Sequence, residues 1–303
     1  VSNHKNALID PLLIATATKR NIYFLTRASA FKLKIIKWLL STINMLPIYR
    51  MRDGKESLAK NEEIFNKCYS LLQHKKCLLI FPEGTHDIRR WVRPLSKGFA
   101  RIVFGFLEKH PNTDLHIVPI GLNYTDATKF AESVSLYFGK PILANTFYNP
   151  DDVNTSMFEL KNIVSEKMKE LTTHIDIEHY EEVIQKLGNI NFLNPYLVNE
   201  EIKLLPNSIQ EVSTEKKVSI LWKFLKTLVI INSIIPFLIF KKIEPNIKEP
   251  EFISTTKFVV GASAIPLFYL LQTLLVNHFW GWQMATAYLI TSILLVLILA
   301  KTK

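Results

Sequence analysis

Apolar runs of strand length alternate with helical patterns through the first 175 residues of this chain. Strands are predicted over 21–26 (NIYFLT), 77–81 (CLLIF), 115–122 (LHIVPIGL) and 134–138 (VSLYF), with helices over 32–44, 56–74, 97–109 and 156–173. This alternation is typical of an α/β domain whose largely parallel sheet is flanked by helices on both faces. In such sheets the functional groups gather in loops beyond the carboxyl ends of the strands.

The chain becomes strongly apolar beyond residue 218. Residues 258–277 carry no charge and are long enough to cross a bilayer, while 284–300 are near the lower length limit. The short aromatic connection 278–282 (HFWGW) suits a helical hairpin that meets a membrane interface. The stretch 218–240 contains two lysines and a proline, so we expect an amphipathic, interfacial front and a re-entrant remainder. A buried helical layer in a soluble protein is the alternative for all three stretches.

These patterns divide the chain into three parts. We predict an α/β domain over 1–175, a polar helical linker over 176–217 and a membrane-associated region over 218–303 with its hairpin at 258–277 and 284–300. The first candidate motif begins at the edge of the chain, and we therefore expect upstream sequence, including a strand that leads into residues 2–4.

The net charge and the cysteine content of the chain indicate its binding partners and its redox compartment. The formal charge of +10 favours an anionic partner, and we expect lipid headgroups rather than nucleic acid because the tail is apolar and no nucleic-acid-binding motif occurs. Cys68 and Cys77 are the only cysteines and form no disulfide framework, which fits a reducing compartment.

Lysines flank both ends of the predicted hairpin on one side, and the positive-inside rule places that side in the cytoplasm. The chain would then be an integral membrane protein with a cytoplasmic α/β domain. If 218–240 also spans the bilayer, the α/β domain lies outside instead. The flanking residues are Lys241, Lys242, Lys248, Lys257, Lys301 and Lys303.

Four short segments in the α/β domain carry the residues suited to chemistry. His4 and Asp10 form a candidate proton-transfer pair, because a neutral imidazole oriented by a carboxylate can take a proton near pH 7. Arg50 follows the apolar segment 47–49 and presents a planar fork that matches phosphate oxygens. A surface turn with solvated arginines is the alternative there, and Arg52 is the reserve candidate.

The third segment, 81–85 (FPEGT), places an acidic turn directly after an apolar strand. Gly84 lets backbone amides approach a ligand closely, and the carboxylate of Glu83 can bind hydroxyl groups. The fourth segment, 118–121 (VPIG), ends another apolar run, and Lys97 opens the helix after the third segment, where an anion would gain from unpaired amides. A structural turn, terminal strand packing and a solvated lysine are the respective alternatives.

In this order the segments resemble the four motifs of the glycerolipid acyltransferase superfamily, whose members acylate glycerol-3-phosphate or lysophosphatidic acid. The resemblance covers residues 1–142, a little under half of the chain. Five residues separate His4 from Asp10 where the common pattern has four, as in branches that look like fungal glycerol-3-phosphate acyltransferases. His86 stands where many members have arginine, and the replacement cation would be Arg89, Arg90, Arg93 or Lys97.

The resemblance implies an O-acyltransferase of phospholipid synthesis. His4 would be the base and Asp10 would orient it, while the substrate-binding residues would be Arg50, Glu83, Gly84, Thr85, Lys97 and Pro119. The donor would be an acyl-CoA or acyl carrier protein thioester, with no metal or other cofactor. A covalent acyl-enzyme is not expected, because no serine or cysteine has the setting of an activated nucleophile.

The acceptor favoured by this resemblance is 1-acylglycerol-3-phosphate, which would yield phosphatidic acid. Glycerol-3-phosphate itself is the alternative, and an aminolipid is a minority option. Two readings from other classes stay open: a non-catalytic, lipid-binding membrane scaffold, and a hydrolase that uses the same His4–Asp10 pair with water.

Overall fold

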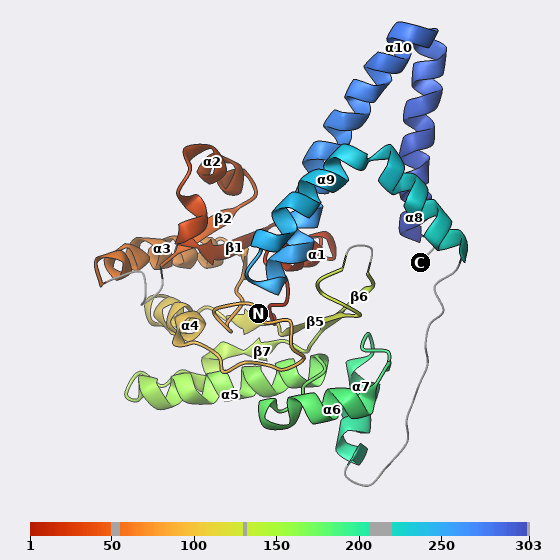
Figure 1. The fold of residues 1–303 in the computed structure, drawn as a ribbon. Coiled ribbons are helices and arrows are strands. Elements are labelled where there is room, and N and C mark those ends of the chain that lie inside the picture. Colours follow the sequence, from red (N-terminus) through yellow and green to blue (C-terminus); the bar gives the residue numbers. More distant parts are fainter. Residues whose placement is uncertain (50–54, 130–131, 206–219, 302–303) are drawn as a thin grey trace. The chain divides into compact units, whose positions relative to one another are not determined.

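The computed structural model describes residues 1–49, 55–129, 132–205 and 220–301 (Figure 1). The chain divides into two compact units. Unit 1 comprises Val1–Tyr124, Val134–Leu187 and Asn191–Gln210, and unit 2 comprises Thr125–Ser133, Gly188–Ile190 and Glu211–Lys303.

Unit 1 contains a three-stranded parallel sheet in the order β2-β1-β3. The central strand β1 (Ile22–Arg27) pairs with β2 (Met45–Ile48) on one side and with β3 (Cys77–Leu79) on the other. Parallel strands end at a common edge, and the third motif follows the end of β3, whereas the second motif begins with the last two residues of β2. The α/β fold is therefore confirmed. The third motif lies beyond a strand end as predicted, but the second overlaps its strand.

The other strands of unit 1 pair antiparallel, so the sheet structure is more mixed than the sequence predicts. The pairs are β4 (His116–Ile117) with β7 (Ile142–Leu143), and β5 (Ile120–Tyr124) with β6 (Val134–Phe138). The single strand predicted over 115–122 is wrong, because it breaks before Pro119 into β4 and β5, which have different partners. Proline has no N–H for a ladder, and the Pro119 carbonyl accepts a hydrogen bond from the amide of Gly139 instead.

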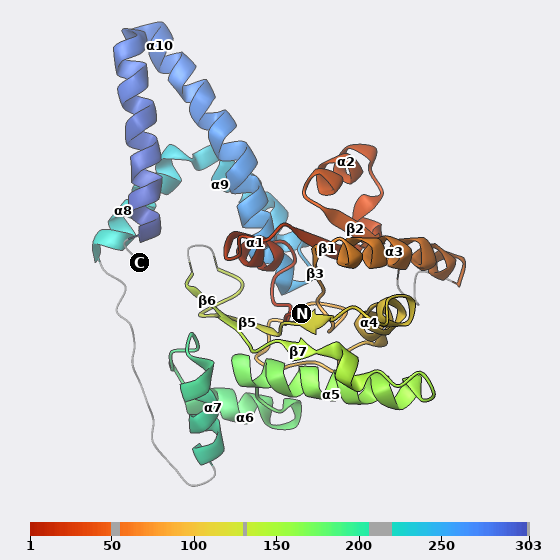
Figure 2. The same cartoon turned by 180° about the vertical axis from the view of Figure 1, so that it is seen from behind.

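The helices of unit 1 surround these strands (Figure 2). They are α1 (Ile9–Thr16), α2 (Lys34–Thr42), α3 (Lys55–Gln73), α4 (Lys97–Lys109), α5 (Val153–Leu171), α6 (Tyr180–Leu187) and α7 (Pro195–Leu204). Helix α4 supplies much of the core, and α5 buries Leu160, Val164 and Met168 at a spacing of four residues. Cys68 lies in the same core, and both cysteines are free, as predicted.

Helices α6 and α7 fall within the predicted linker but belong to unit 1. The side-chain amide of Asn199 on α7 donates to the carbonyls of Lys169 and Thr172 at the end of α5. The hydroxyl of Tyr180 on α6 accepts the amide of Arg90 at 3.0 Å. These bonds tie both helices to the strand-and-helix body of unit 1.

Gly121, from the fourth motif, is required by close packing. A Cβ atom at this position would lie 2.0 Å from the carbonyl oxygen of Leu171, so any side chain would separate β5 from the end of α5. This glycine therefore has a structural role.

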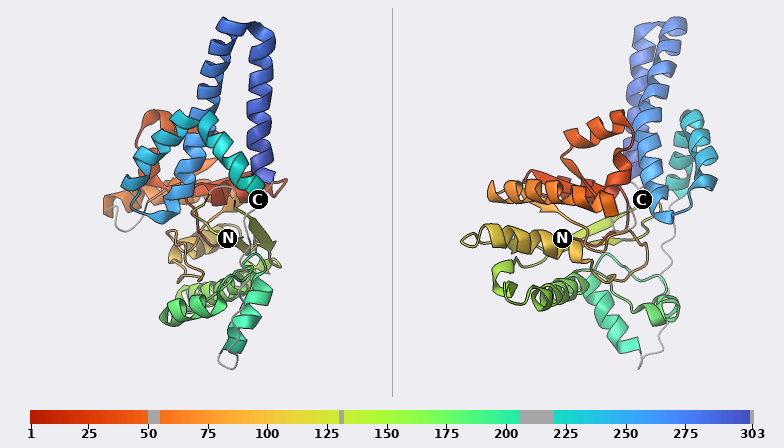
Figure 3. Two further views of the ribbon diagram at one scale, coloured as in Figure 1. Left: turned by 45° about the vertical axis from the view of Figure 1, so that its right-hand side comes forward. Right: turned by 90° about the vertical axis from the view of Figure 1, so that its left-hand side faces the viewer.

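Unit 2 consists mainly of three apolar helices, α8 (Ile220–Asn232), α9 (Ile234–Ile243) and α10 (Ile253–Lys301). Helix α10 breaks at Gly281, where φ is 80°, into two arms that run side by side in both views of Figure 3. The predicted spans 258–277 and 284–300 lie in these arms. The helix Pro250–Lys301 contains an 18-residue stretch with a mean hydropathy of 2.1 and is long and apolar enough to cross a membrane, while α8 and the α9 segment meet at 90°.

Candidate active site

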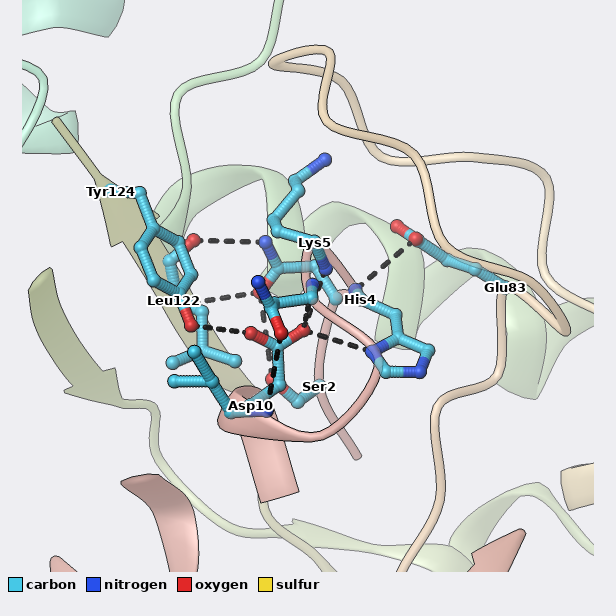
Figure 4. A network of polar contacts seen from close by, with 10 residues as sticks. Ser2, His4, Lys5, Asp10, Glu83, Leu122 and Tyr124 are labelled. Carbon is cyan, nitrogen blue, oxygen red and sulfur yellow. Dashed lines mark hydrogen bonds and ion pairs between the residues drawn. The ribbon is translucent and has the colours of Figure 1, made fainter. Parts of the chain in front are cut away.

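His4 and Asp10 form the centre of a polar network in unit 1 (Figure 4). His4 lies in the turn before α1, Asp10 lies in the first turn of that helix, and Nδ1 of His4 is 2.9 Å from Oδ2 of Asp10. The same Oδ2 accepts the amides of Lys5 and Asn6 at 2.7 Å each. The turn thus folds around the carboxylate, and it accommodates the five-residue spacing between His4 and Asp10.

Asp10 is fully buried and accepts a fourth hydrogen bond at its other oxygen. The hydroxyl of Tyr124, at the end of β5, donates to Oδ1 over 2.6 Å. Burial, followed by the charge of Asp10 and this bond, raises the pKa of Tyr124 above its ordinary value. All four partners act as donors here, which is the environment of an ionised, acceptor-only carboxylate.

This environment fixes the role of the imidazole. Because Asp10 accepts, Nδ1 of His4 carries the proton and Nε2 carries the lone pair that a base needs. The ring stacks on Phe81 with centroids 3.9 Å apart and an interplanar angle of 12°, and its side chain is 13% exposed. The His4–Asp10 arrangement can therefore remove a proton from a hydroxyl group presented to Nε2.

Glu83 joins the third motif to the first. One carboxylate oxygen accepts the amide of His4 and the other accepts the amide of Arg93, each at 3.3 Å. Burial raises the pKa of Glu83, and the positive charge of Lys5 opposes that shift. Sequence reasoning assigned this carboxylate to acceptor binding, but the contacts present here are with the protein backbone and position the turn.

The turn containing Glu83 closes with a hydrogen bond from the amide of Gly84 to the carbonyl of Phe81 at 3.1 Å. Gly84 has a φ of 72°, a conformation that glycine adopts readily because it lacks the Cβ atom that disfavours it in other residues. The amide of Ser96 donates to the carbonyl of Pro82 at 2.8 Å, which places the start of α4 beside this turn. Lys97, the first residue of α4, is exposed, and Thr85 in the turn is half-buried.

A buried lysine that sequence reasoning missed completes this region. Lys5 is 7% exposed, and its Nζ donates to the carbonyls of Arg89 and Trp91 at 2.5 and 3.2 Å. Burial lowers the pKa of Lys5, and the charge of Glu83 is the largest effect opposing that shift. Lys5 therefore ties the segment that follows the third motif to the turn that holds His4.

The candidate replacement cations differ in the contacts that their side chains make. Arg89 pairs with Asp87 at 2.6 Å, and Arg90 donates to the carbonyl of Tyr124 at 2.9 Å while its guanidinium lies over the ring of Phe192. Arg93 is half-buried, and its Nε has no hydrogen-bond partner among the residues that the structure describes.

Arg50, with its reserve Arg52, lies outside the described residues. Pro119 is described and is not part of this network. Pro119 precedes β5 whereas Tyr124 ends it, which separates the two by about 17 Å along the strand. Sequence reasoning missed Tyr124, and the signal that could have found it was a polar aromatic side chain at the end of the strand-forming segment 120–124 (IGLNY).

Comparison with known proteins finds similarity to acyltransferases. Residues 1–123 match the model of the Acyltransferase family. Two relatives from Saccharomyces cerevisiae are Glycerol-3-phosphate O-acyltransferase 1, 32% identical over 114 residues, and Glycerol-3-phosphate O-acyltransferase 2, 33% identical over 88 residues. An uncharacterized acyltransferase of Schizosaccharomyces pombe is 32% identical over 85 residues.

These alignments cover 36%, 29% and 28% of this chain, and 15%, 12% and 13% of the respective relatives. The chain thus spans less than a sixth of the length of the curated relatives it matches. The matched part, residues 1–123, is thus similar to the Acyltransferase family and to fungal proteins named as acyltransferases, two of them as glycerol-3-phosphate O-acyltransferases.

Proposed function

We propose that this chain transfers an acyl group from a thioester to a hydroxyl group of glycerol-3-phosphate. The observation that supports it best is the His4–Asp10 pair, with its 2.9 Å contact and a carboxylate surrounded by donors. The names of the two Saccharomyces cerevisiae relatives move the preferred acceptor from 1-acylglycerol-3-phosphate, favoured by sequence reasoning, to glycerol-3-phosphate.

In the proposed reaction, Nε2 of His4 takes the proton of the acceptor hydroxyl as its oxygen attacks the thioester carbonyl. Asp10 holds the imidazole in the required tautomer and stabilises the imidazolium that forms. The tetrahedral intermediate then releases the thiolate, which receives the proton from Nε2. The amide of Gly84 already donates to Phe81, so a backbone donor for the oxyanion in this turn would be another amide, such as that of Thr85.

The phosphate of the acceptor would be held by cations around the third motif. Arg93 is our first candidate there, because its backbone amide contacts Glu83 and its Nε has no partner among the described residues. Lys97 is the second, because it opens α4 beside the turn. Arg50 remains a proposal on sequence grounds.

To test the proposal, the purified chain and its His4→Ala variant are each incubated with labelled acyl-CoA and with labelled acyl carrier protein thioesters. Glycerol-3-phosphate and 1-acylglycerol-3-phosphate are supplied in parallel. We expect lysophosphatidic acid from the parent with glycerol-3-phosphate and a loss of about 10²–10⁴-fold in the variant. Formation of phosphatidic acid from 1-acylglycerol-3-phosphate would show that this lipid is the acceptor instead. Free fatty acid alone would indicate a hydrolase. Equal rates in both proteins would refute the role of His4.

We further propose that unit 2 anchors the protein in a membrane. The two arms of α10 would cross the bilayer, and α8 with α9 would enter and return on one side. Asn232, at their junction, bonds to Ser292, Tyr288 and Gln272 of α10 at 3.0–3.3 Å. Gln272 and Tyr288 lie nine and seven residues from the break at Gly281, about 10–14 Å along each arm.

The depth of Asn232 along α10 supports a re-entrant segment formed by α8 and α9. A junction 10–14 Å below the hairpin tip would lie near the middle of a hydrocarbon layer of about 30 Å, and α8, with 13 residues, is only about 20 Å long. With the lysines on the same side, the α/β domain would face the cytoplasm. Lys223→Cys and Lys242→Cys, each made in a chain with Cys68 and Cys77 replaced by alanine, would then be labelled from one side of sealed vesicles. Labelling from opposite sides would make α8–α9 a spanning segment.

A further inference from the structure

Helix α2 presents a continuous apolar surface to solvent. None of its nine residues is buried, and Ile35, Trp38 and Leu39 are 74%, 67% and 54% exposed. Phe158 on α5 is similarly exposed at 64%, but its neighbours three and four residues away are all polar. On α7, Leu197 and Leu204 are 64% and 55% exposed, but Glu200 and Glu201 lie between them on the same side of the helix.

The helical period separates α2 into two adjacent faces. At about 100° per residue, Ile35, Trp38 and Leu39 fall within one sector of about 100°. Lys34 and Lys37, both exposed, fall in the neighbouring sector, with Trp38 at the boundary. An apolar face bordered by lysines with tryptophan at the margin is the pattern of a helix that lies in a membrane interface.

The sequence that flanks α2 carries charge of one sign. Residues 11–49 contain six lysines and arginines and no aspartate or glutamate. An apolar helix face flanked by basic residues matches a bilayer that contains acidic phospholipids, because its acyl-chain layer is apolar and its headgroup layer is anionic. A protein partner would have to supply both an apolar groove and a surrounding ring of carboxylates.

We propose that α2 is an interfacial helix that seats unit 1 on an acidic lipid surface. Ile35, Trp38 and Leu39 enter the boundary between headgroups and acyl chains, and Lys34 and Lys37 contact anionic headgroups. This contact is separate from the proposed anchoring by unit 2, and it does not depend on the proposed reaction. It lies on the connection from β1 to β2, immediately before the strand that leads to the second motif.

Quenching of tryptophan fluorescence by lipids brominated on the acyl chain tests this proposal. The full chain is reconstituted in vesicles of phosphatidylcholine with phosphatidylserine and compared with a Trp38→Phe/Phe158→Trp chain, which moves one equally exposed indole from α2 to α5. The other tryptophans are common to both proteins. We expect stronger quenching in the parent, with the difference reduced in phosphatidylcholine alone. Equal quenching in the two chains would overturn the proposal.

Charge reversal on α2 gives a second measurement that retains Trp38. Lys34→Glu/Lys37→Glu should weaken the binding of α2 to acidic vesicles by on the order of tenfold, read as loss of quenching. Lys76→Glu/Lys140→Glu changes the net charge equally at other exposed positions and should leave quenching unchanged. Equal effects of the two pairs would refute specific headgroup contacts. A Trp38 emission shifted to the blue but not quenched would show that protein covers α2.

Discussion

The hydroxyl of Tyr124 provides a sharp test of the network. Tyr124→Phe removes the hydroxyl that donates to Oδ1 of Asp10, a 2.6 Å bond to a fully buried carboxylate. A hydrogen bond to a charged group contributes about 1.5–3 kcal/mol, so we expect the free energy of unfolding to fall by about 2 kcal/mol at pH 8. Tyr137→Phe is the matched control, because its hydroxyl donates at 3.1 Å to a neutral carbonyl and should contribute about 1 kcal/mol.

The effect of Tyr124→Phe should depend on pH with a defined sign. The pKa of Tyr124 is raised in the folded state, so its contribution is fully present below the unfolded value of about 10 and is lost as pH rises above it. The parent then loses about 1.4 kcal/mol by pH 11 through ionisation in the unfolded state, which the phenylalanine variant cannot do. The difference between the two proteins should therefore shrink to about 0.6 kcal/mol.

Urea-induced unfolding of the detergent-solubilised chain at pH 8, 10 and 11 measures this difference. If Tyr124→Phe costs no more than Tyr137→Phe, or if its cost is the same at all three pH values, the buried phenol–carboxylate bond does not carry the stability assigned to it. Acyl transfer by the variant should fall far less than with His4→Ala, because Nδ1 of the imidazole keeps its bond to Asp10.

Three further changes test other parts of the site and fold. Asp10→Asn should lower the rate of acyl transfer by at least about a hundredfold while the chain stays folded by circular dichroism, because the carboxamide no longer fixes the imidazole tautomer; a rate near that of the parent would contradict this. A double-mutant cycle of Lys5→Met and Glu83→Gln should give a coupling of about 0.5–3 kcal/mol in urea unfolding, because each buried charge offsets the burial of the other; additive effects would refute the coupling. Gly121→Ala should lower the free energy of unfolding by about 2 kcal/mol or more. Gly98→Ala is the control and should be neutral or stabilising, because a Cβ atom there would have its nearest neighbour at 3.7 Å. Equal effects of the two changes would show that β5 can move to accommodate a side chain.

The parts of the fold that followed from the sequence were those set by hydrophobic periodicity. Helix α4 was predicted with its observed ends, and β6 likewise, because each has a clear pattern bounded by polar residues. The run 115–122 was read as one strand because its hydrophobic pattern is uninterrupted. Its division into two strands depends on Pro119 and on partners distant in sequence, neither of which periodicity encodes.

The candidate site was predictable to the extent that its residues are close in sequence. His4 and Asp10 lie on either side of one turn, so their contact could be inferred from spacing and resemblance. Tyr124 approaches Asp10 from 114 residues away, and Lys5 reaches carbonyls 84 and 86 residues away. Contacts of this kind are set by how strands and loops are assembled, which local pattern does not report.

The four motifs differ in what they contribute once they are folded together. The first supplies the proposed base His4 and the carboxylate of Asp10, and the third supplies Glu83, whose oxygens accept hydrogen bonds from the amides of His4 and Arg93. The fourth contributes packing through Gly121, and the strand that follows it delivers the Tyr124 hydroxyl to Asp10. Asp10, Phe81 and Glu83 therefore hold His4 in place through its ring and its backbone amide. In the proposed direct transfer the rate depends on the position of Nε2, which these three residues set.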